Sequence, residues 1–286
     1  MGQHSPRVAA VVVLYEPGNE VLGNIHSWGG EVEVVYAVDN SERAVEMLID
    51  RLAALGNVIY LPQEENVGIA RALNIGAQLA VKEGYDFLLT MDQDSSAEPD
   101  MVARLLECVT EGEGKAPGIV APFHLTRAVR HSPPESKFTE VMTPMTSGCL
   151  LDLAAWQMVG PFRDDFFIDF VDNEYCLRLR RKGYRVVRAN RAILEHAVGD
   201  ITRYGPLIAT NHSPLRRYYK TRNRFVVFQE YLTTFPGHCL FDLVRLAKEI
   251  GSIILFEQEK RAKLCMMWRG ISDFVRDRLG KFTGTF

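Results

Sequence analysis

The feature that most constrains this chain is the alternation of short apolar runs with helical patterns in its first half. The runs 8–15, 32–38, 58–61, 87–91 and 118–121 are short and almost wholly apolar, which is typical of buried parallel strands. Apolar residues at helical spacing fill 45–55, 70–80 and 101–109. Gly56 and Gly84 stand where helix C-caps belong, and Asn66 is an expected N-cap. This repetition predicts an α/β fold with a mostly parallel central sheet flanked by helices.

The pattern changes after Pro122. Residues 124–143 are polar and carry Pro133 and Pro134, so we expect a loop there, and a second loop over 197–213. Beyond Ser213 the chain is predicted to be helical. We therefore expect a main domain over 1–230 and a C-terminal helical extension over 231–286.

Composition excludes several classes of protein. The chain has 33 Lys and Arg against 36 Asp and Glu, a net charge of −3, so nucleic-acid binding is not expected. No apolar run is long enough to span a bilayer, and no charged-then-apolar leader follows Met1. The five cysteines are scattered and form no C-x-x-C pair; they are Cys108, Cys149, Cys176, Cys239 and Cys265. This usage indicates reduced thiols in a cytoplasmic protein.

The sharpest chemical signal is Asp92-Gln93-Asp94, which directly follows the apolar run 87–91. Two carboxylates one residue apart suit a hard divalent cation such as Mg²⁺ or Mn²⁺ together with substrate phosphates. The alternative is a solvated turn, because Asp and Ser favour turns. Placement at the carboxyl end of a parallel strand favours the ligand site.

Asp39 closes the second predicted strand and is followed by Asn40 and Ser41. It is either the acceptor for the N–H of a pyrimidine base or the start of an Asx-turn. Spacing leaves both interpretations open.

The segment 166–183 holds a second group of carboxylates. Asp169 or Asp172 is expected to begin a helix whose inner face carries Val171, Tyr175 and Leu179. A carboxylate in a first helical turn is stabilised in its ionised form, as a general base requires. The alternative is that Asp169, Asp172 and Glu174 only cap the helix.

Two further groups carry weaker signals. His196 follows strand-like residues and is either structural or a metal ligand beside Asp94. A basic cluster over 216–224 is either a solvated helix face or a site that neutralises a diphosphate. Its members are Arg216, Arg217, Lys220, Arg222 and Arg224.

Taken together in their order, these segments resemble the inverting family 2 glycosyltransferases with the GT-A fold, in particular bacterial rhamnosyltransferases. The matching stretches are VVVLYEP, VDNS at 38–41, ENVGIARALNIG at 65–76, TMDQDS at 90–95, SGCLL at 147–151, FFIDFVDNEYCLRLRRKGY at 166–184, LEH at 194–196 and YYKTRNR at 218–224. The resemblance runs from about Val8 to Phe228. Residues beyond about Tyr231 match nothing in it.

The resemblance implies a role for particular residues. Asp39 would bind the base of a nucleotide sugar, with Asn66, Gly68 and Arg71 beside the nucleoside and Arg222 on the diphosphate. Asp92 would contact the ribose or the metal, and Asp94 and His196 would hold Mg²⁺ or Mn²⁺. Asp172 would be the catalytic base, and the acceptor side would include Asp169, Glu174, Ser147 and Gly148. Many relatives have Glu-Asp where this chain has Val171-Asp172, so one acceptor-side carboxylate is missing and Asp169 is expected to replace it.

The implied activity is inverting transfer of L-rhamnose from dTDP-β-L-rhamnose to a saccharide or polyprenyl-linked acceptor of a cell-surface polysaccharide such as O-antigen or capsule. The alternatives are transfer from a different nucleotide sugar, a sugar nucleotidyltransferase, or an inactive sugar-nucleotide-binding protein. A nucleotidyltransferase would carry a Gly-rich phosphate loop after its first strand, where this chain reads LYEPGNE.

The extension mixes apolar residues such as Phe241 and Ile254 with basic ones such as Arg245 and Lys248. This composition fits an interfacial helix at the inner face of the cell membrane. A helix packed on the domain and a homodimer contact fit equally well.

Overall fold

The computed structural model describes residues 5–43, 46–111, 115–126, 132–196, 202–204 and 207–284. The elements, in chain order, are β1 (Val8–Leu14), α1 (Glu20–Gly29), β2 (Val34–Asp39), α2 (Glu46–Ala53), β3 (Val58–Pro62), α3 (Ile69–Lys82), β4 (Phe87–Asp92), β5 (Ser95–Ala97), α4 (Met101–Glu111), β6 (Pro117–Thr126), β7 (Phe138–Glu140), β8 (Cys149–Asp152), α5 (Leu153–Val159), the 3-10 turn η1 (Asp164–Phe166), α6 (Val171–Arg181), β9 (Arg185–His196), β10 (Thr202–Tyr204), β11 (Leu207–Ala209), α7 (Pro214–Tyr231), α8 (Pro236–Phe256) and α9 (Lys260–Val275).

The chain divides into two compact units, each described here by itself. The first comprises Met1–Phe162 and Tyr175–Ala197, and the second comprises Arg163–Glu174 and Val198–Phe286. This division differs from the expected one at residue 230, because α7 packs with α9 in the second unit. The expected domains 1–230 and 231–286 stay a prediction.

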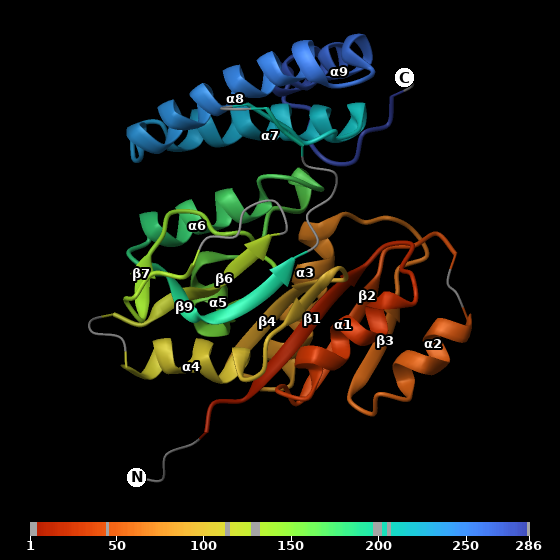
Figure 1. The fold of residues 1–286 in the computed structure, drawn as a ribbon, viewed down its shortest axis with the longest axis vertical. Coiled ribbons are helices and arrows are strands. Elements are labelled where there is room, and N and C mark those ends of the chain that lie inside the picture. The colour runs from red at the N-terminus through yellow and green to blue at the C-terminus, as the bar shows by residue number, and fades with distance from the viewer. Residues whose placement is uncertain are drawn as a thin grey trace. The chain divides into compact units, whose positions relative to one another are not determined.

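The first unit is built on one central sheet with the strand order β3-β2-β1-β4-β8-β6-β9-β5, and β7 pairs with β9. The four strands β1 to β4 are mutually parallel, as their apolar runs predicted. Beyond β4 the sheet is mixed, since β8 runs antiparallel to both β4 and β6. The predicted α/β architecture is confirmed (Figure 1).

Helices pack on both faces of this sheet. On one face, Ala10, Val12 and Leu14 of β1 share a core cluster with Trp28 of α1. On the other face α3 lies so close to β1 that a Cβ added at Gly76 would stand 2.5 Å from the Cβ of Val11. Burial on both faces explains why β1 carries no polar side chain.

The expected loops contain more structure than their composition indicated. The stretch 124–143 includes the end of β6 and the strand β7, which pairs with β9. The stretch 197–213 includes the hairpin β10–β11. Residues 127–131, 197–201 and 205–206 lie outside the described part of the chain. The stretch 124–143 differs from the expected loop because β7 pairs through its backbone with β9, and no local sequence pattern indicates such a distant partner.

The second unit consists of the turn-rich segment before α6, the hairpin β10–β11 and the helices α7, α8 and α9. Ser213 caps α7, since its Oγ accepts from the N–H of Arg216. One core cluster joins Tyr218 and Tyr219 to Met266, and another joins Leu246 and Ile253 to Met267. The helices predicted beyond Ser213 are thus present and packed on one another.

Candidate functional site

Asp39 and Asp92, two residues predicted for the donor side, lie at the carboxyl edge of the parallel strands. In the register of the sheet, Leu14 of β1 pairs with Asp39 of β2, and Val13 pairs with Asp92 of β4. The chain leaves β1 toward β2 and β3 on one side, and β4 lies on the other side. Such a switch of direction creates the crevice in which α/β sheets bind their ligands.

Gln93 fixes the acidic turn after β4. Its Oε1 accepts from the N–H of Tyr15 at 2.8 Å, and its Nε2 donates to the Tyr15 carbonyl at 3.1 Å. Its own carbonyl accepts from the side chain of Asn24 at 2.8 Å. The residue between the two aspartates therefore ties the turn to the segment after β1. Sequence reasoning passed over Gln93, because a Gln between two acids carries no chemical signal of its own.

Ser147 and Gly148 lie beneath the same turn. The Ser147 hydroxyl accepts from the N–H of Asp92 at 3.1 Å and donates to the Ser95 hydroxyl at 2.8 Å. Gly148 has φ +76°, and an added Cβ would stand 2.6 Å from Pro122, so only glycine fits there. Both residues are buried. This geometry supports the turn, and their predicted acceptor-side role stays a prediction.

The predicted metal ligands stand in the turn after β4 and at the end of β9. The Asp94 side chain is exposed and Asp92 is half-buried. His196 is the last residue of β9, and its backbone pairs with Ser95 of β5, although its side chain lies outside the described residues. Within the described part of the chain, no three His, Cys, Asp or Glu side chains are grouped as a complete metal site. The oxygen donors of Asp92 and Asp94 suit Mg²⁺ or Mn²⁺ when substrate phosphates complete the shell.

Asp39 is buried and its carboxylate is held by two neighbours. One oxygen accepts from the N–H of Ser41 at 2.8 Å, which is the Asx-turn that the sequence left open. The other accepts from the Tyr60 hydroxyl at 2.6 Å. Burial first, and then this hydrogen bond to Asp39, raises the pKa of Tyr60. Since a carboxylate accepts about four hydrogen bonds, the Asp39 carboxylate can also accept from the N–H of a nucleotide base.

The segment 66–71 begins beside Asp39. The Asn66 side chain accepts from the N–H of Gly68 at 3.0 Å, and Asn40 donates to the Gly68 carbonyl at 3.4 Å. Our expectation that Asn66 is the N-cap of α3 was wrong, since Gly68 occupies that position with φ 84° and ψ 159°. Only glycine readily adopts this conformation. Arg71 is exposed in the first turn of α3.

In the second unit, the carboxylates before α6 sit on a strained turn. Phe167, Asp169 and Phe170 all have φ between 62° and 65°, a left-handed conformation that costs non-glycine residues free energy. Asp172 is the second residue of α6, and its Oδ1 accepts from the N–H of Asn173 at 2.8 Å. Burial raises the pKa of Asp172; hydrogen bonds from Asn173 oppose that effect, and the nearby Asp169 charge adds to it.

Asn223 and Arg222 hold this turn in place. The Asn223 side-chain nitrogen donates to the carbonyls of Phe166, Ile168 and Asp169, each at 2.9 Å. Arg222 donates to the carbonyls of Asp165, Phe166 and Gly280. Both side chains are 0% exposed. We call this arrangement the carbonyl clamp. Arg222 was predicted to contact the diphosphate, and such a contact would require these hydrogen bonds to break.

Two further members of the basic cluster, Arg217 and Arg224, do not form a solvated helix face. Arg217 and Arg224 are 1% and 3% exposed. They form ion pairs with carboxylates of α8 and of the residue after it, including Arg224 with Asp242 at 2.8 Å and Arg217 with Glu257 at 2.7 Å. Arg216 instead pairs with Asp169 at 3.2 Å. Tertiary packing thus brings carboxylates that are distant in the sequence into ion pairs with these arginines.

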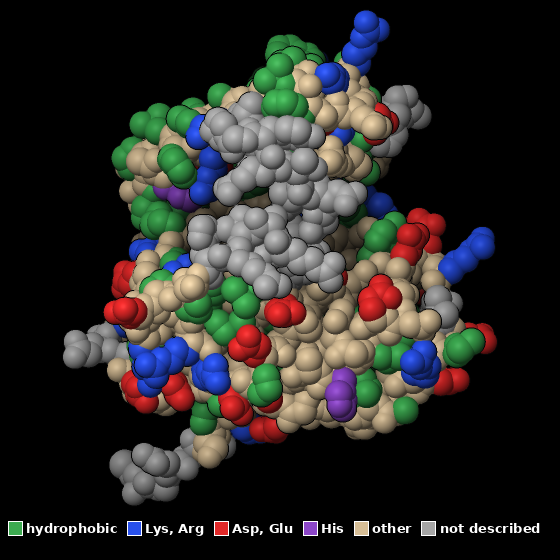
Figure 2. All heavy atoms as spheres, viewed as in Figure 1, with side chains coloured by type: hydrophobic (Ala, Val, Ile, Leu, Met, Phe, Trp, Pro, Cys, Tyr) green, Lys and Arg blue, Asp and Glu red, His purple; other side chains and the backbone are tan. Residues whose placement is uncertain are grey.

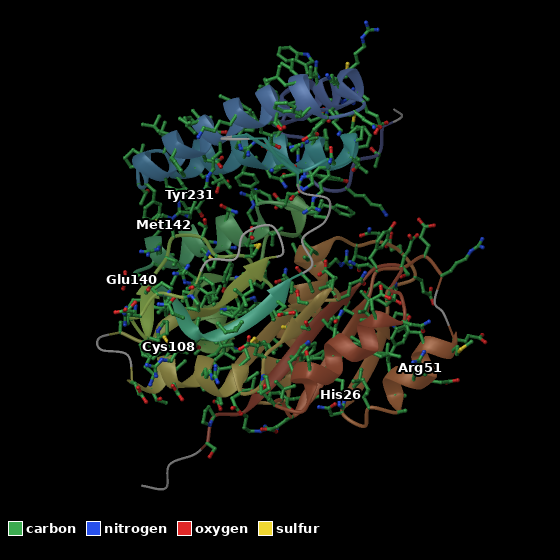
Figure 3. All side chains as sticks on the ribbon, viewed as in Figure 1. His26, Arg51, Cys108, Glu140, Met142 and Tyr231 are labelled. Carbon is green, nitrogen blue, oxygen red and sulfur yellow. The ribbon has the colours of Figure 1, made fainter. Side chains whose placement is uncertain are left out.

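Glu174 is also buried, and Tyr231 near the end of α7 (labelled in Figure 3) donates its hydroxyl to the Glu174 carboxylate at 2.7 Å. The partner of Glu174 lies far along the chain, so no local pattern indicated it. Its predicted acceptor-side role stays a prediction.

Comparison with known proteins indicates a family and a fold. The model of the family described as glycosyl transferase family 2 matches residues 19–139. The dTDP-rhamnosyl transferase RfbF of Shigella flexneri is 29% identical over 245 residues, which cover 78% of this chain and 80% of that protein.

Solved structures share the fold. The S. aureus TarS 1-349 structure in complex with UDP-GlcNAc aligns with a TM-score of 0.61 at 14% identity, covering 94% of this chain and 81% of that one. GalNAc-T7 with UDP, GalNAc and Mn²⁺ aligns with a TM-score of 0.58 at 13% identity over 77% of this chain. This chain spans about half of GalNAc-T7, 48% of its length.

The family model and the relative indicate a glycosyltransferase, and the solved structures share the fold. We conclude that residues 19–139 match glycosyl transferase family 2 and that the chain has a GT-A-type fold.

Proposed function

We propose that this glycosyltransferase transfers L-rhamnose, with inversion, from dTDP-β-L-rhamnose to a saccharide or polyprenyl-linked acceptor in cell-surface polysaccharide synthesis. The observation that carries the proposal is the Asp92-Gln93-Asp94 turn, tied by Gln93 to the segment after β1 at the switch point of the sheet. The similarity to a dTDP-rhamnosyl transferase supports the choice of donor.

On the donor side, Asp39 would accept from the base, while Asn66, Gly68 and Arg71 would line the nucleoside. Asp92, Asp94 and His196 would hold Mg²⁺ or Mn²⁺ together with the diphosphate oxygens. When bound, the cation neutralises charge that develops on the departing nucleoside diphosphate.

On the acceptor side, Asp172 would take the proton of the acceptor hydroxyl as that oxygen attacks the anomeric carbon. The carbon–oxygen bond to the diphosphate breaks in the same step, so dTDP leaves from the opposite face and the anomeric configuration inverts. Asp169 and Glu174 would shape the acceptor site. Through the carbonyl clamp, Arg222 and Asn223 would position the turn that carries Asp169 and precedes Asp172.

The polyprenyl-linked acceptor would be met at the cytoplasmic face of the membrane. Among the described residues, no helix is both long and apolar enough to traverse a bilayer.

The test is a panel of sugar nucleotides assayed for binding and turnover, with and without Mg²⁺ or Mn²⁺. The wild-type protein is compared with Asp94→Ala and with the control Glu98→Ala, which removes an exposed carboxylate outside the predicted site. We expect selection of dTDP-rhamnose and metal-dependent turnover that only Asp94→Ala abolishes. Selection of another donor would overturn the rhamnose assignment, and absence of binding by every donor would overturn the transferase assignment.

A further inference from the structure

The outer surface of α8 and α9 carries charge of one sign only. The exposed charged side chains of these two helices are Arg245, Lys248, Lys260, Arg261 and Arg269. Both helices are described along their whole length, and neither exposes an acidic side chain. Figure 2 shows Lys and Arg side chains beside hydrophobic ones over this part of the second unit.

The acidic residues of α8 and α9 are turned inward. Asp242 and Glu249 pair with Arg224 of α7, and Glu249 also pairs with Lys220 at 3.2 Å. Asp273 of α9 is buried and accepts from the Tyr218 hydroxyl at 3.0 Å. The fold therefore turns the acidic side chains of these helices inward and leaves basic ones exposed, of which Arg269 pairs with Asp273 at 3.2 Å.

Large apolar side chains accompany these cations along α8. Leu240, Phe241, Val244, Ile254 and Leu255 are between 49% and 60% exposed. Positions 240, 244, 247, 251 and 254 follow one another at intervals of three or four residues, so they form one stripe along the helix. Ala247 and Gly251 fill the middle of this stripe. The stripe is roughly 22 Å long at 1.5 Å per residue.

We propose that this outer face of α8, defined as Leu240, Phe241, Val244, Arg245, Lys248, Ile254 and Leu255, binds the surface of an anionic lipid bilayer. An apolar stripe with basic neighbours is the pattern of helices that lie in the plane of a membrane interface. Anionic head groups complement the exclusively basic charge, while the apolar stripe enters the acyl boundary. The proposal deepens the lipid-linked acceptor of the proposed function but requires no catalysis.

The test is co-flotation of the full chain with vesicles. We expect recovery with vesicles of phosphatidylcholine and phosphatidylglycerol, little recovery with phosphatidylcholine alone, and release by high salt. Arg245→Gln and Lys248→Gln should each weaken binding about five-fold. Phe241→Ser should weaken vesicle binding on the order of ten-fold, because the variant lacks the aromatic side chain that enters the bilayer.

Met158→Ser is the matched control, since Met158 on α5 is 75% exposed and lies outside this face. It should float like the wild-type protein. Light scattering after size-exclusion chromatography accompanies each variant. Absence of flotation, or flotation that the α8 variants leave unchanged, overturns the proposal. A dimer that Phe241→Ser dissociates, without vesicle binding, overturns it in favour of self-association. A chain that floats but transfers no sugar upholds this inference while the proposed function fails.

Discussion

At the scale of single residues, the candidate base and its supports are the most informative. Asp172 sits in the first turn of α6, where the helix dipole favours a carboxylate. Burial acts in the opposite direction and raises its pKa. A base with a raised pKa is a stronger proton acceptor, provided that the pH keeps it ionised.

Because only the ionised form accepts a proton, kcat should fall as the pH drops through the raised pKa of Asp172. The acid limb of the kcat profile is thus expected above the ordinary pKa of a free carboxyl group. Asp172→Asn should lower kcat by about 10³-fold, with little change in donor affinity. The measurement is kcat against pH, with Asp164→Asn, an exposed carboxylate before the turn, as the control. If Asp172→Asn keeps the wild-type kcat, Asp172 is not the catalytic base.

Asn223 offers a second test at this scale. Asn223→Asp keeps the shape of the side chain but replaces the donor to three carbonyls with an acceptor. We expect the turn to shift and kcat to fall about 100-fold, while KM for the donor stays within a few-fold, since small displacements of catalytic groups carry this cost.

Gln229→Ala, an exposed amide on the same helix, should leave both constants unchanged. Donor binding measured by calorimetry separates a displaced turn from an unfolded protein. Equal losses in kcat and in donor binding would show that Asn223 only stabilises the fold.

At the scale of elements, the contact between α3 and β1 decides how tightly the sheet is covered. Small residues line the buried side of α3, among them Ala72, Gly76 and Ala80. They bring the helix to the strand that lies between Asp39 and Asp92 in the sheet. The spacing of these residues predicted a helix, while the closeness of the approach is visible only in the structure.

Two glycine substitutions should therefore have opposite effects. Gly76→Ala places a Cβ 2.5 Å from Val11 and should lower the free energy of unfolding by about 1–3 kcal/mol through overpacking. Gly23→Ala in α1 meets nothing within 4 Å and should raise it by about 0.5–1 kcal/mol. Urea denaturation measures both. Equal effects of the two changes would contradict the close packing of α3 on β1.

At the scale of the whole molecule, stability should depend on pH through the ion pairs of the second unit. Burial alone would raise the pKa of Glu249, but Lys220, Arg224 and Arg217 lower it to about 2. A carboxyl with a lowered folded-state pKa stabilises the fold above its unfolded pKa of about 4.5. This contribution is lost as the pH falls from about 4.5 to about 2.

The free energy of unfolding should therefore fall across that window, and Glu249→Gln should flatten the dependence. The same change should cost about 3–5 kcal/mol at neutral pH, since it leaves buried cations without their partner. Glu98→Gln, which changes an exposed carboxylate of the first unit, should follow the wild-type curve. Thermal unfolding recorded between pH 2 and pH 7 checks this prediction; parallel curves for Glu249→Gln and wild type would contradict it.

Local patterns in the sequence determined the parallel strands β1 to β4, the helices α2 and α3 and the positions of Asp39 and Asp92 at strand ends. The helix α1 was not predicted. The predicted features follow from periodicity and from helix-ending glycines such as Gly84, which act over a few residues. The ordered motifs also determined the family, which the comparisons bear out.

Only the tertiary structure decided how the remaining polar residues are used. It buried Arg217, Arg222 and Arg224, which the sequence left open as part of a solvated helix face or of a diphosphate site. Glu257 pairs with Arg217 and Glu249 with Arg224, and backbone carbonyls far along the chain accept hydrogen bonds from Arg222. The tertiary structure also placed Gln93 against Tyr15 and Asn223 against the turn before α6. The physical reason is that burial of a polar group depends on partners distant in sequence, and no local periodicity records those partners.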